Sequence, residues 1–302
     1  MSRPKQKVTW IAATWVPLLF ACVAALQVGI DARTRTAIQE QEELLLSSPS
    51  AVQKISLGYD SLLADVYWTR AVQYYGSRAG TDHPNFDLLW PLLDITTTLD
   101  PKLVIAYRFG AVFLSEPGRA GAGRTDLAIK LVKRGIAANP DQWRLGADLG
   151  FLYYWRLKDY QDSAAAYLEA SKEPDAPLWL KIMAARVAQK GGSLETSRMI
   201  WSQLYESTQN QTVRKKAAEI LRGLKAQEDE TRLDELAGEY QKRFGRFPAS
   251  MLELRDAGLV RGIPLDPDGY PYIFGPNGKS RLNPQSSVVI LPEIKAPPSP
   301  AK

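Results

Sequence analysis

The chain has 302 residues, which is enough for one large domain or two modest domains with a real apolar core. It carries 38 basic and 33 acidic residues, and three of the bases lie before residue 8, so the remaining chain is nearly balanced and nucleic-acid binding is not expected. A single cysteine and a single histidine exclude an intrachain disulfide and a Cys/His zinc site, and they disfavour a catalytic triad. We therefore predict a protein that is not an enzyme and has no metal or cofactor.

The first predicted element is a membrane anchor. Residues 8–30 contain no charged side chain, and as a helix rising about 1.5 Å per residue they would span about 34 Å, enough for a bilayer. Arg3, Lys5 and Lys7 precede this run, which places the N-terminus in the cytoplasm under the positive-inside rule. The favoured prediction is an uncleaved signal anchor over residues 1–36 that crosses the bacterial inner membrane once, with the rest of the chain in the periplasm.

Two other interpretations of the N-terminus stay open. The small residues Val23-Ala24-Ala25 would suit cleavage of a signal peptide. The string Leu19-Phe20-Ala21-Cys22 resembles a bacterial lipobox, which implies a lipoprotein anchored through Cys22. A lipobox is usually followed by a polar tether, whereas residues 23–30 stay apolar.

The middle of the chain repeats. From residue 56, apolar side chains recur at three- and four-residue spacing, which predicts helix after helix. The pairs Asp100-Pro101, Asn139-Pro140 and Glu173-Pro174 punctuate the pattern, with prolines 39 and 34 residues apart. A period near 34 residues with two helices per unit is typical of a helical solenoid.

The residues inside one unit strengthen this interpretation. Leu149, Gly150 and Tyr153 share a face of a first helix, and a second helix carries Ser163, Tyr167 and Ala170. This pattern resembles a tetratricopeptide (TPR) repeat, and four partial matches cover about residues 56–208 within a predicted repeat domain of residues 37–210. The fold class is therefore predicted as all-α: a TPR-like helical solenoid with an N-terminal transmembrane helix and a small C-terminal α+β element.

The TPR resemblance implies a groove that binds a peptide or helix of a protein partner. Projecting the repeats predicts a basic and aromatic surface on the first helices, suited to an acidic or extended partner. The predicted groove residues are Tyr107, Arg108, Arg144, Phe151, Tyr154, Trp155, Trp179, Arg186 and Lys190. For Tyr154 and Trp155, a place in the core between repeats is an equally good interpretation.

A glycine-rich segment at residues 116–124 is predicted as a flexible loop between helices, with Thr125 as a helix cap. It lacks the Gly-Lys-Ser/Thr of a phosphate loop. We expect a large side chain at Gly121 to be tolerated there.

Residues 211–243 are predicted as a helical region that caps the solenoid. Two apolar stripes run along this segment, and they are out of phase across residues 227–230. The phase difference predicts a break or bend at that point.

The last predicted domain is a small element over residues 244–291, followed by a disordered Pro-rich tail at residues 292–302. We expect strands at residues 270–274 and 288–291. Residues 244–280 resemble the C-terminal part of type II secretion major pseudopilins through the string Asp266-Pro267, Gly269, Pro271-Tyr272, Gly275-Pro276 and Gly278. The resemblance implies a similar small β element and an association with pilus-like machinery. Asp268 stands where an aromatic residue is usual, and the pseudopilin processing site and long helix are absent from the sequence.

A calcium site at Asp266 and Asp268 stays open as an alternative to a tight turn, which is favoured. For the whole chain, the sequence favours a membrane-anchored TPR scaffold or adaptor that mediates protein–protein interaction in the bacterial envelope, with pilus or secretion assembly as one setting. The alternative is an extracytoplasmic binding module for a glycan or small molecule.

Overall fold

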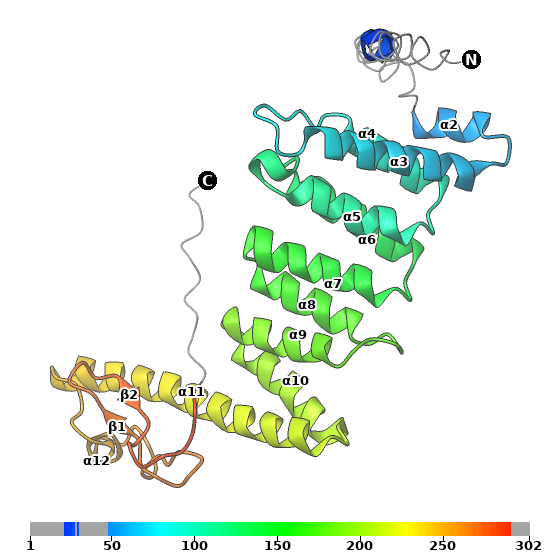
Figure 1. The fold of residues 1–302 in the computed structure, drawn as a ribbon. Helices are drawn as coiled ribbons and strands as arrows, with labels where there is room; N and C mark the ends of the chain where they lie inside the picture. Colours follow the sequence, from blue (N-terminus) through cyan, green and yellow to red (C-terminus); the bar gives the residue numbers. More distant parts are fainter. Residues whose placement is uncertain (1–20, 28, 30–47, 291–302) are drawn as a thin grey trace, which may run out of the picture. The chain divides into compact units, whose positions relative to one another are not determined.

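The computed structural model describes residues 21–27, 29 and 48–290 (Figure 1). Over these residues the fold is mostly helical with one short hairpin, which confirms the predicted all-α class. No helix of the described part of the chain is both long enough and apolar enough to cross a bilayer. Most of the predicted anchor at residues 8–30 lies outside the described residues, although Cys22 falls in a helical stretch where its thiol is exposed.

The chain divides into two compact units, of which the first comprises residues 1–76 and 87–100. Its helices are α2 (Pro49–Ile55), α3 (Asp60–Arg78) and α4 (Leu89–Leu99). Helix α2 begins after Ser48, whose hydroxyl accepts a hydrogen bond from the Ala51 amide, and it packs against α4. Helix α4 is apolar on nearly all sides and accordingly buries most of its residues.

The second unit comprises residues 77–86 and 101–302. It contains α5 (Val104–Ser115), α6 (Thr125–Ala138), α7 (Trp143–Phe151), α8 (Tyr160–Ala170), α9 (Trp179–Lys190) and α10 (Leu194–Ser207). A π-helical segment, η2 (Leu152–Leu157), continues α7, and a short 3-10 turn, η1 (Gly118–Ala120), precedes α6. Each of these α-helices packs against the next along the chain (Figure 1).

Glycines let these helices approach closely. A Cβ added at Gly135 of α6 would lie 2.7 Å from the ring of Tyr107 on α5. A Cβ at Gly150 of α7 would lie 2.9 Å from the ring of Tyr167 on α8. Real Cβ atoms do not come this near, so both positions require glycine unless the aromatic ring moves.

The segment at residues 116–124 is not the flexible loop that its glycines suggested. The amides of Ala122, Gly123 and Arg124 donate to backbone carbonyls at the end of α5, which ties the segment to that helix. A Cβ at Gly121 would lie 2.6 Å from the Phe113 carbonyl oxygen, so the expected tolerance at Gly121 was wrong. Thr125 is the first residue of α6 and not its cap.

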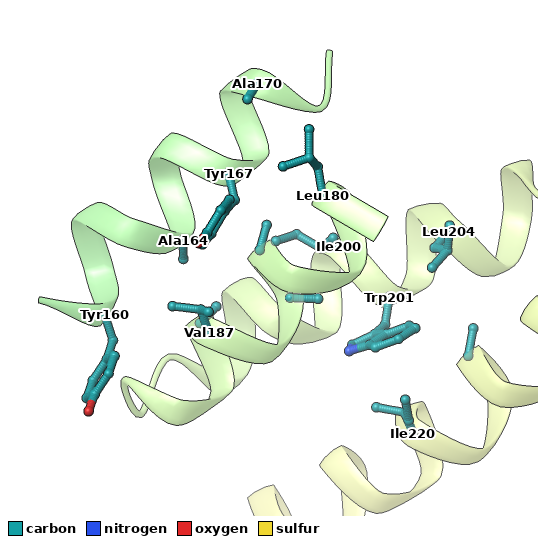
Figure 2. Packing of buried hydrophobic residues seen from close by; sticks show 14 of the residues in the cluster. Tyr160, Ala164, Tyr167, Ala170, Leu180, Val187, Ile200, Trp201, Leu204 and Ile220 are labelled. Atoms are coloured by element: carbon teal, nitrogen blue, oxygen red, sulfur yellow. The ribbon is translucent and has the colours of Figure 1, made fainter. Parts of the chain in front are cut away.

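One continuous core runs from α8 into the long helix α11 (Gln211–Phe244), as Figure 2 shows. Trp201 and Ile200 of α10 lie between side chains of α9 and those of the first half of α11. The first half of α11 therefore covers the helix pair of α9 and α10. The labelled members of this core are Tyr160, Ala164, Tyr167, Ala170, Leu180, Val187, Ile200, Trp201, Leu204 and Ile220.

The break predicted at residues 227–230 is absent, because α11 is continuous. Its two apolar stripes are out of phase since they face different partners. Ile220 and Leu224 join the core with α10, whereas Leu233 and Tyr240 pack against the C-terminal element. The Asn210 side chain caps the start by accepting from the amides of Thr212 and Val213.

The C-terminal element consists of α12 (Met251–Asp256) and an antiparallel hairpin of β1 (Ile273–Phe274) and β2 (Ser280–Arg281). Its core with α11 contains Leu233, Tyr240, Met251, Leu254 and Tyr272. The strand predicted at 270–274 is thus shorter than expected. No strand forms over residues 288–290, where the Val289 carbonyl lies so close to α11 that a Cβ at Gly223 would meet it at 2.4 Å.

Candidate functional site

The candidate site is the surface formed by the exposed side chains of α5, of α7 with η2, and of α9, here called the first-helix surface. These are the first helices of three successive pairs in the second unit. Two ion pairs join α5 to the end of α7. Arg108 Nε lies 2.6 Å from Asp148 Oδ2, and Arg156 pairs with Glu116. In each pair the residues are 40 positions apart, so neighbouring first helices present equivalent turns to each other.

Asp148 occupies a partly desolvated position. Burial raises the pKa of its carboxyl above the ordinary value, although the hydrogen bond and charge of Arg108 act in the opposite direction. The pair therefore does not fully compensate the cost of burying the carboxylate. Arg108, which we predicted to contact a partner, is committed to this internal contact.

The end of α7 and the π-helical segment that follows it carry an exposed aromatic pair. Hydrogen bonds in η2 span five residues instead of four, and Lys158 at its end has a φ of 57°. Phe151 and Trp155 stack nearly parallel, with ring centroids 6.4 Å apart and an angle of 11° between the planes. They remain 48% and 53% exposed, and the Lys158 ammonium lies 4.6 Å from the Trp155 ring centroid.

A second cluster joins η2 to α9. Lys190 Nζ donates to the Tyr154 hydroxyl at 2.7 Å and lies near the ring of Tyr160. The hydrogen bond to Tyr154 raises the pKa of Lys190, so the ammonium form is favoured. Tyr154 is half-buried and contacts the core, which agrees with the interpretation that places it between repeats.

A third cluster gathers tryptophans at the start of α7 and α9. Trp143 meets Trp179 edge to face at 6.1 Å, and Arg144 lies 4.4 Å from the Trp143 ring centroid. A cleft of about 270 Å³ opens beside Trp143 between α6, α7 and α8. Its apolar walls include Gly146 and Ala170, and Lys133, Glu169 and Glu173 also line it.

The predicted groove residues thus fall into three groups. Arg144, Phe151, Trp155, Trp179 and Arg186 are exposed. Arg108, Tyr154 and Lys190 are half-buried and bind side chains of this chain. Tyr107 is fully buried, so its assignment to the surface was wrong. The ring of Tyr107 packs against Gly135, where it fills the space that the glycine leaves.

Sequence reasoning missed an apolar strip on α5. Ile105, Phe109 and Val112 are about half exposed and follow one another at helical spacing, next to Arg108. Tyr107 and Ala111 supply the buried face on the other side of α5, but the sequence-based prediction placed Tyr107 on the surface and therefore contained no signal for this strip.

No group of three or more His, Cys, Asp or Glu side chains that could hold a metal was found among the residues that the structure describes. In the candidate calcium loop, Asp266 Oδ1 accepts hydrogen bonds from the amides of Asp268 and Tyr270, which builds a tight turn. Asp268 pairs with Arg222 and accepts from Ser287. Both carboxylates are therefore used within the fold, although Asp266 Oδ2 is buried without a partner.

Tyr167 gives a test of the packing behind the first-helix surface. Burial raises the pKa of its hydroxyl from 10.0 to about 12, with a smaller contribution from the charge of Asp148. As pH rises from 10 to 12, the unfolded chain loses this proton while the folded protein retains it, so stability falls across that window.

Between pH 10 and 12 the free energy of unfolding should fall less in Tyr167→Phe than in the parent protein, by at most about 2 kcal/mol. Urea unfolding below and within this pH window would measure it. Tyr272, whose pKa burial also raises, contributes in the same direction in both proteins and leaves a residual slope. An identical pH dependence for the variant and the parent would contradict the buried, neutral hydroxyl.

No protein-family model matches this chain, and a search of curated proteins finds no match.

Proposed function

We propose that this protein is a membrane-anchored adaptor of the bacterial envelope that captures another protein on the first-helix surface. In this proposal the repeats form a TPR-like solenoid, residues 8–30 span the inner membrane, and the bulk of the chain lies in the periplasm. The observation that carries the proposal is the combination of exposed aromatic rings and unpaired basic groups on successive first helices.

Recurring contacts between neighbouring helix pairs of the second unit support the solenoid interpretation. Asn139 Nδ2 donates to the Pro101 carbonyl, and Lys102 Nζ donates to the Ala138 carbonyl. Together with the Arg108–Asp148 pair, these contacts join residues 36 to 40 positions apart, which is close to the period of the prolines. Contacts that repeat near one period are expected when each repeat touches its neighbours along the chain.

The charges of the surface define the partner chemistry. Within the described residues, Arg186 has no ion-pair partner and Arg144 contacts only the Trp143 ring, while the acidic Asp148 and Glu116 are already paired. The charges of Arg144 and Arg186, which lie on the same surface as the exposed rings, are therefore not neutralised by an ion pair. We propose an acidic, extended segment of a protein as the ligand, held by aromatic contact area and guided by charge.

Arg144→Glu combined with Arg186→Glu is expected to weaken capture of the partner by about tenfold or more, because two attractive contacts become repulsive. Crosslinking in intact membranes followed by mass spectrometry would measure the recovery. Raising the salt concentration should weaken capture by the parent protein more than by the variant.

The matched control is Lys215→Glu with Arg261→Glu, which changes the net charge equally at two exposed positions away from the surface. It should recover the same partners as the parent protein. Equal recovery by the surface variant would remove the first-helix surface from the proposal.

A second candidate function rests on the stacked pair of Phe151 and Trp155. Two exposed, nearly parallel rings offer a platform on which the apolar face of a sugar could lie. For a glycan-binding module, Trp155→Ala should abolish retention on a glycan array while the double arginine variant binds normally. The adaptor proposal predicts no retention on the array for the parent protein.

The string shared with pseudopilins is used inside this chain, since Tyr272 is buried against α11 and its hydroxyl lies 3.2 Å from Asp229 Oδ2. Asp266 shapes the turn that leads to it. The string therefore supports docking of the C-terminal element on α11.

A further inference from the structure

The turn between α2 and α3 presents apolar side chains to solvent. Ile55, Leu57 and Tyr59 are 68%, 85% and 67% exposed. The turn itself is well built, because the Tyr59 amide donates to the Ser56 carbonyl and the buried Ser56 hydroxyl donates to the Gln53 carbonyl. These side chains therefore stand on a fixed turn.

The backbone of this turn is unusual for its sequence. Leu57 has a φ of 51° and Gly58 a φ of 90°, so both central residues lie in the left-handed region. Asn, Asp and Gly are the residues that such turns favour, and a bulky aliphatic residue at positive φ is uncommon. The fold accepts this backbone and gains no burial of the Leu57 side chain.

The apolar surface continues onto α3. Leu62 and Val66 lie one helical turn apart and are both exposed. We call Ile55, Leu57, Tyr59, Leu62 and Val66 the apolar tip. Three charged side chains lie beside it, Lys54 with Asp60 and Asp65, so electrostatic attraction to an anionic surface is not its basis. Burial of aliphatic and aromatic groups is the interaction that it can offer.

The position of the tip in the chain indicates what covers it. Residues 31–48 connect the apolar run at residues 8–30 to α2, at whose end the tip begins, and a chain of this length reaches at most about 65 Å when fully extended. A convex tip of leucine, isoleucine and tyrosine suits a bilayer interface, which accepts such side chains without a complementary pocket. We propose that the apolar tip inserts into the outer leaflet of the membrane that residues 8–30 cross. This proposal rests on the anchoring stated under the proposed function.

A fluorescent label at position 57 of the full-length chain tests the insertion. Cys22→Ser removes the only cysteine, and Leu57→Cys then provides one site for an environment-sensitive dye. The protein is reconstituted into vesicles of phosphatidylethanolamine and phosphatidylglycerol in equal parts, with or without brominated acyl chains. The control label is at Gln73→Cys, an exposed position of α3 that lies about 20 Å along the helix axis from the first residue of α3.

We expect blue-shifted emission at position 57 that brominated lipids quench, and neither effect at position 73. Ile55→Ser with Tyr59→Ser should reduce the quenching at position 57, while circular dichroism shows unchanged helix content. High salt should leave the quenching in place, since the tip is apolar.

Flotation of the vesicles separates this proposal from the anchoring. If the protein floats but position 57 is neither shifted nor quenched, the tip does not insert. A blue shift without quenching would show that protein covers the tip, either the apolar run Leu44-Leu45-Leu46 of this chain or a second copy, and would also overturn the proposal. If the protein does not float, the anchoring fails, and absence of quenching by added vesicles would then reject the tip as well. Quenching without stable flotation would support insertion of the tip and contradict anchoring through residues 8–30.

Discussion

Gly150→Leu is expected to destabilise the second unit by about 3 kcal/mol, because the new side chain has no space. A Cβ alone at this position would lie 2.9 Å from Tyr167 Cδ1 and Cε1. The backbone cannot retreat easily, since the buried Ser163 hydroxyl donates to the Gly150 carbonyl at 2.8 Å. The ring of Tyr167 is also confined by Trp179, whose centroid is 6.5 Å away. Denaturant unfolding would measure the loss.

Gly238→Ala is the matched control for that substitution. Gly238 also lies inside a helix, and an added Cβ there meets nothing within 4 Å. The alanine should raise stability by up to about 1 kcal/mol through helix propensity. Gly150→Ala should lower stability, so the two alanine variants are expected to have opposite signs. Equal effects would contradict the close contact of α7 with α8.

Deletion of residues 244–302 is expected to unfold the second half of α11 and to leave helices α5 to α10 folded. Leu233 and Tyr240 would lose the core that they share with the C-terminal element. The deletion would also remove the hydrogen bonds that the Ser280 amide donates to Asp234 and the Ser280 hydroxyl donates to the Glu230 carbonyl. An isolated helix end of this length is marginal in water. Hydrogen exchange should therefore become fast over residues 229–243.

The same experiment should show retained protection over residues 160–224, because Ile220 and Leu224 belong to the separate core with α10. Leu254→Ala provides a milder version, since truncating this buried side chain should loosen the C-terminal element by about 2–5 kcal/mol. Loss of protection throughout the second unit in either variant would show that the two cores unfold as one.

The helical class and the order of the elements follow from local patterns in the sequence. Spacing of apolar residues at three and four positions predicts helices, and prolines mark where they end, because both effects act within a few residues of the chain. The place of Gly150 on the face of the first helix could also be predicted, because the repeat pattern sets that face against the second helix. For the same reason, five of the nine predicted groove residues are exposed on the expected helices.

Tertiary contacts decided what local patterns could not. Tyr107 was assigned to the surface, but its ring packs in the core against Gly135 of another helix, where the absence of a side chain leaves space for it. The phase shift in α11 predicted a break or bend because the sequence does not show that two different partners cover one continuous helix. The π-helical hydrogen bonds of η2, which continues α7 beyond Phe151 and carries Trp155, are signalled by no residue type. Residues distant in the sequence determine burial and side-chain pairing, so these features become visible only in the folded chain.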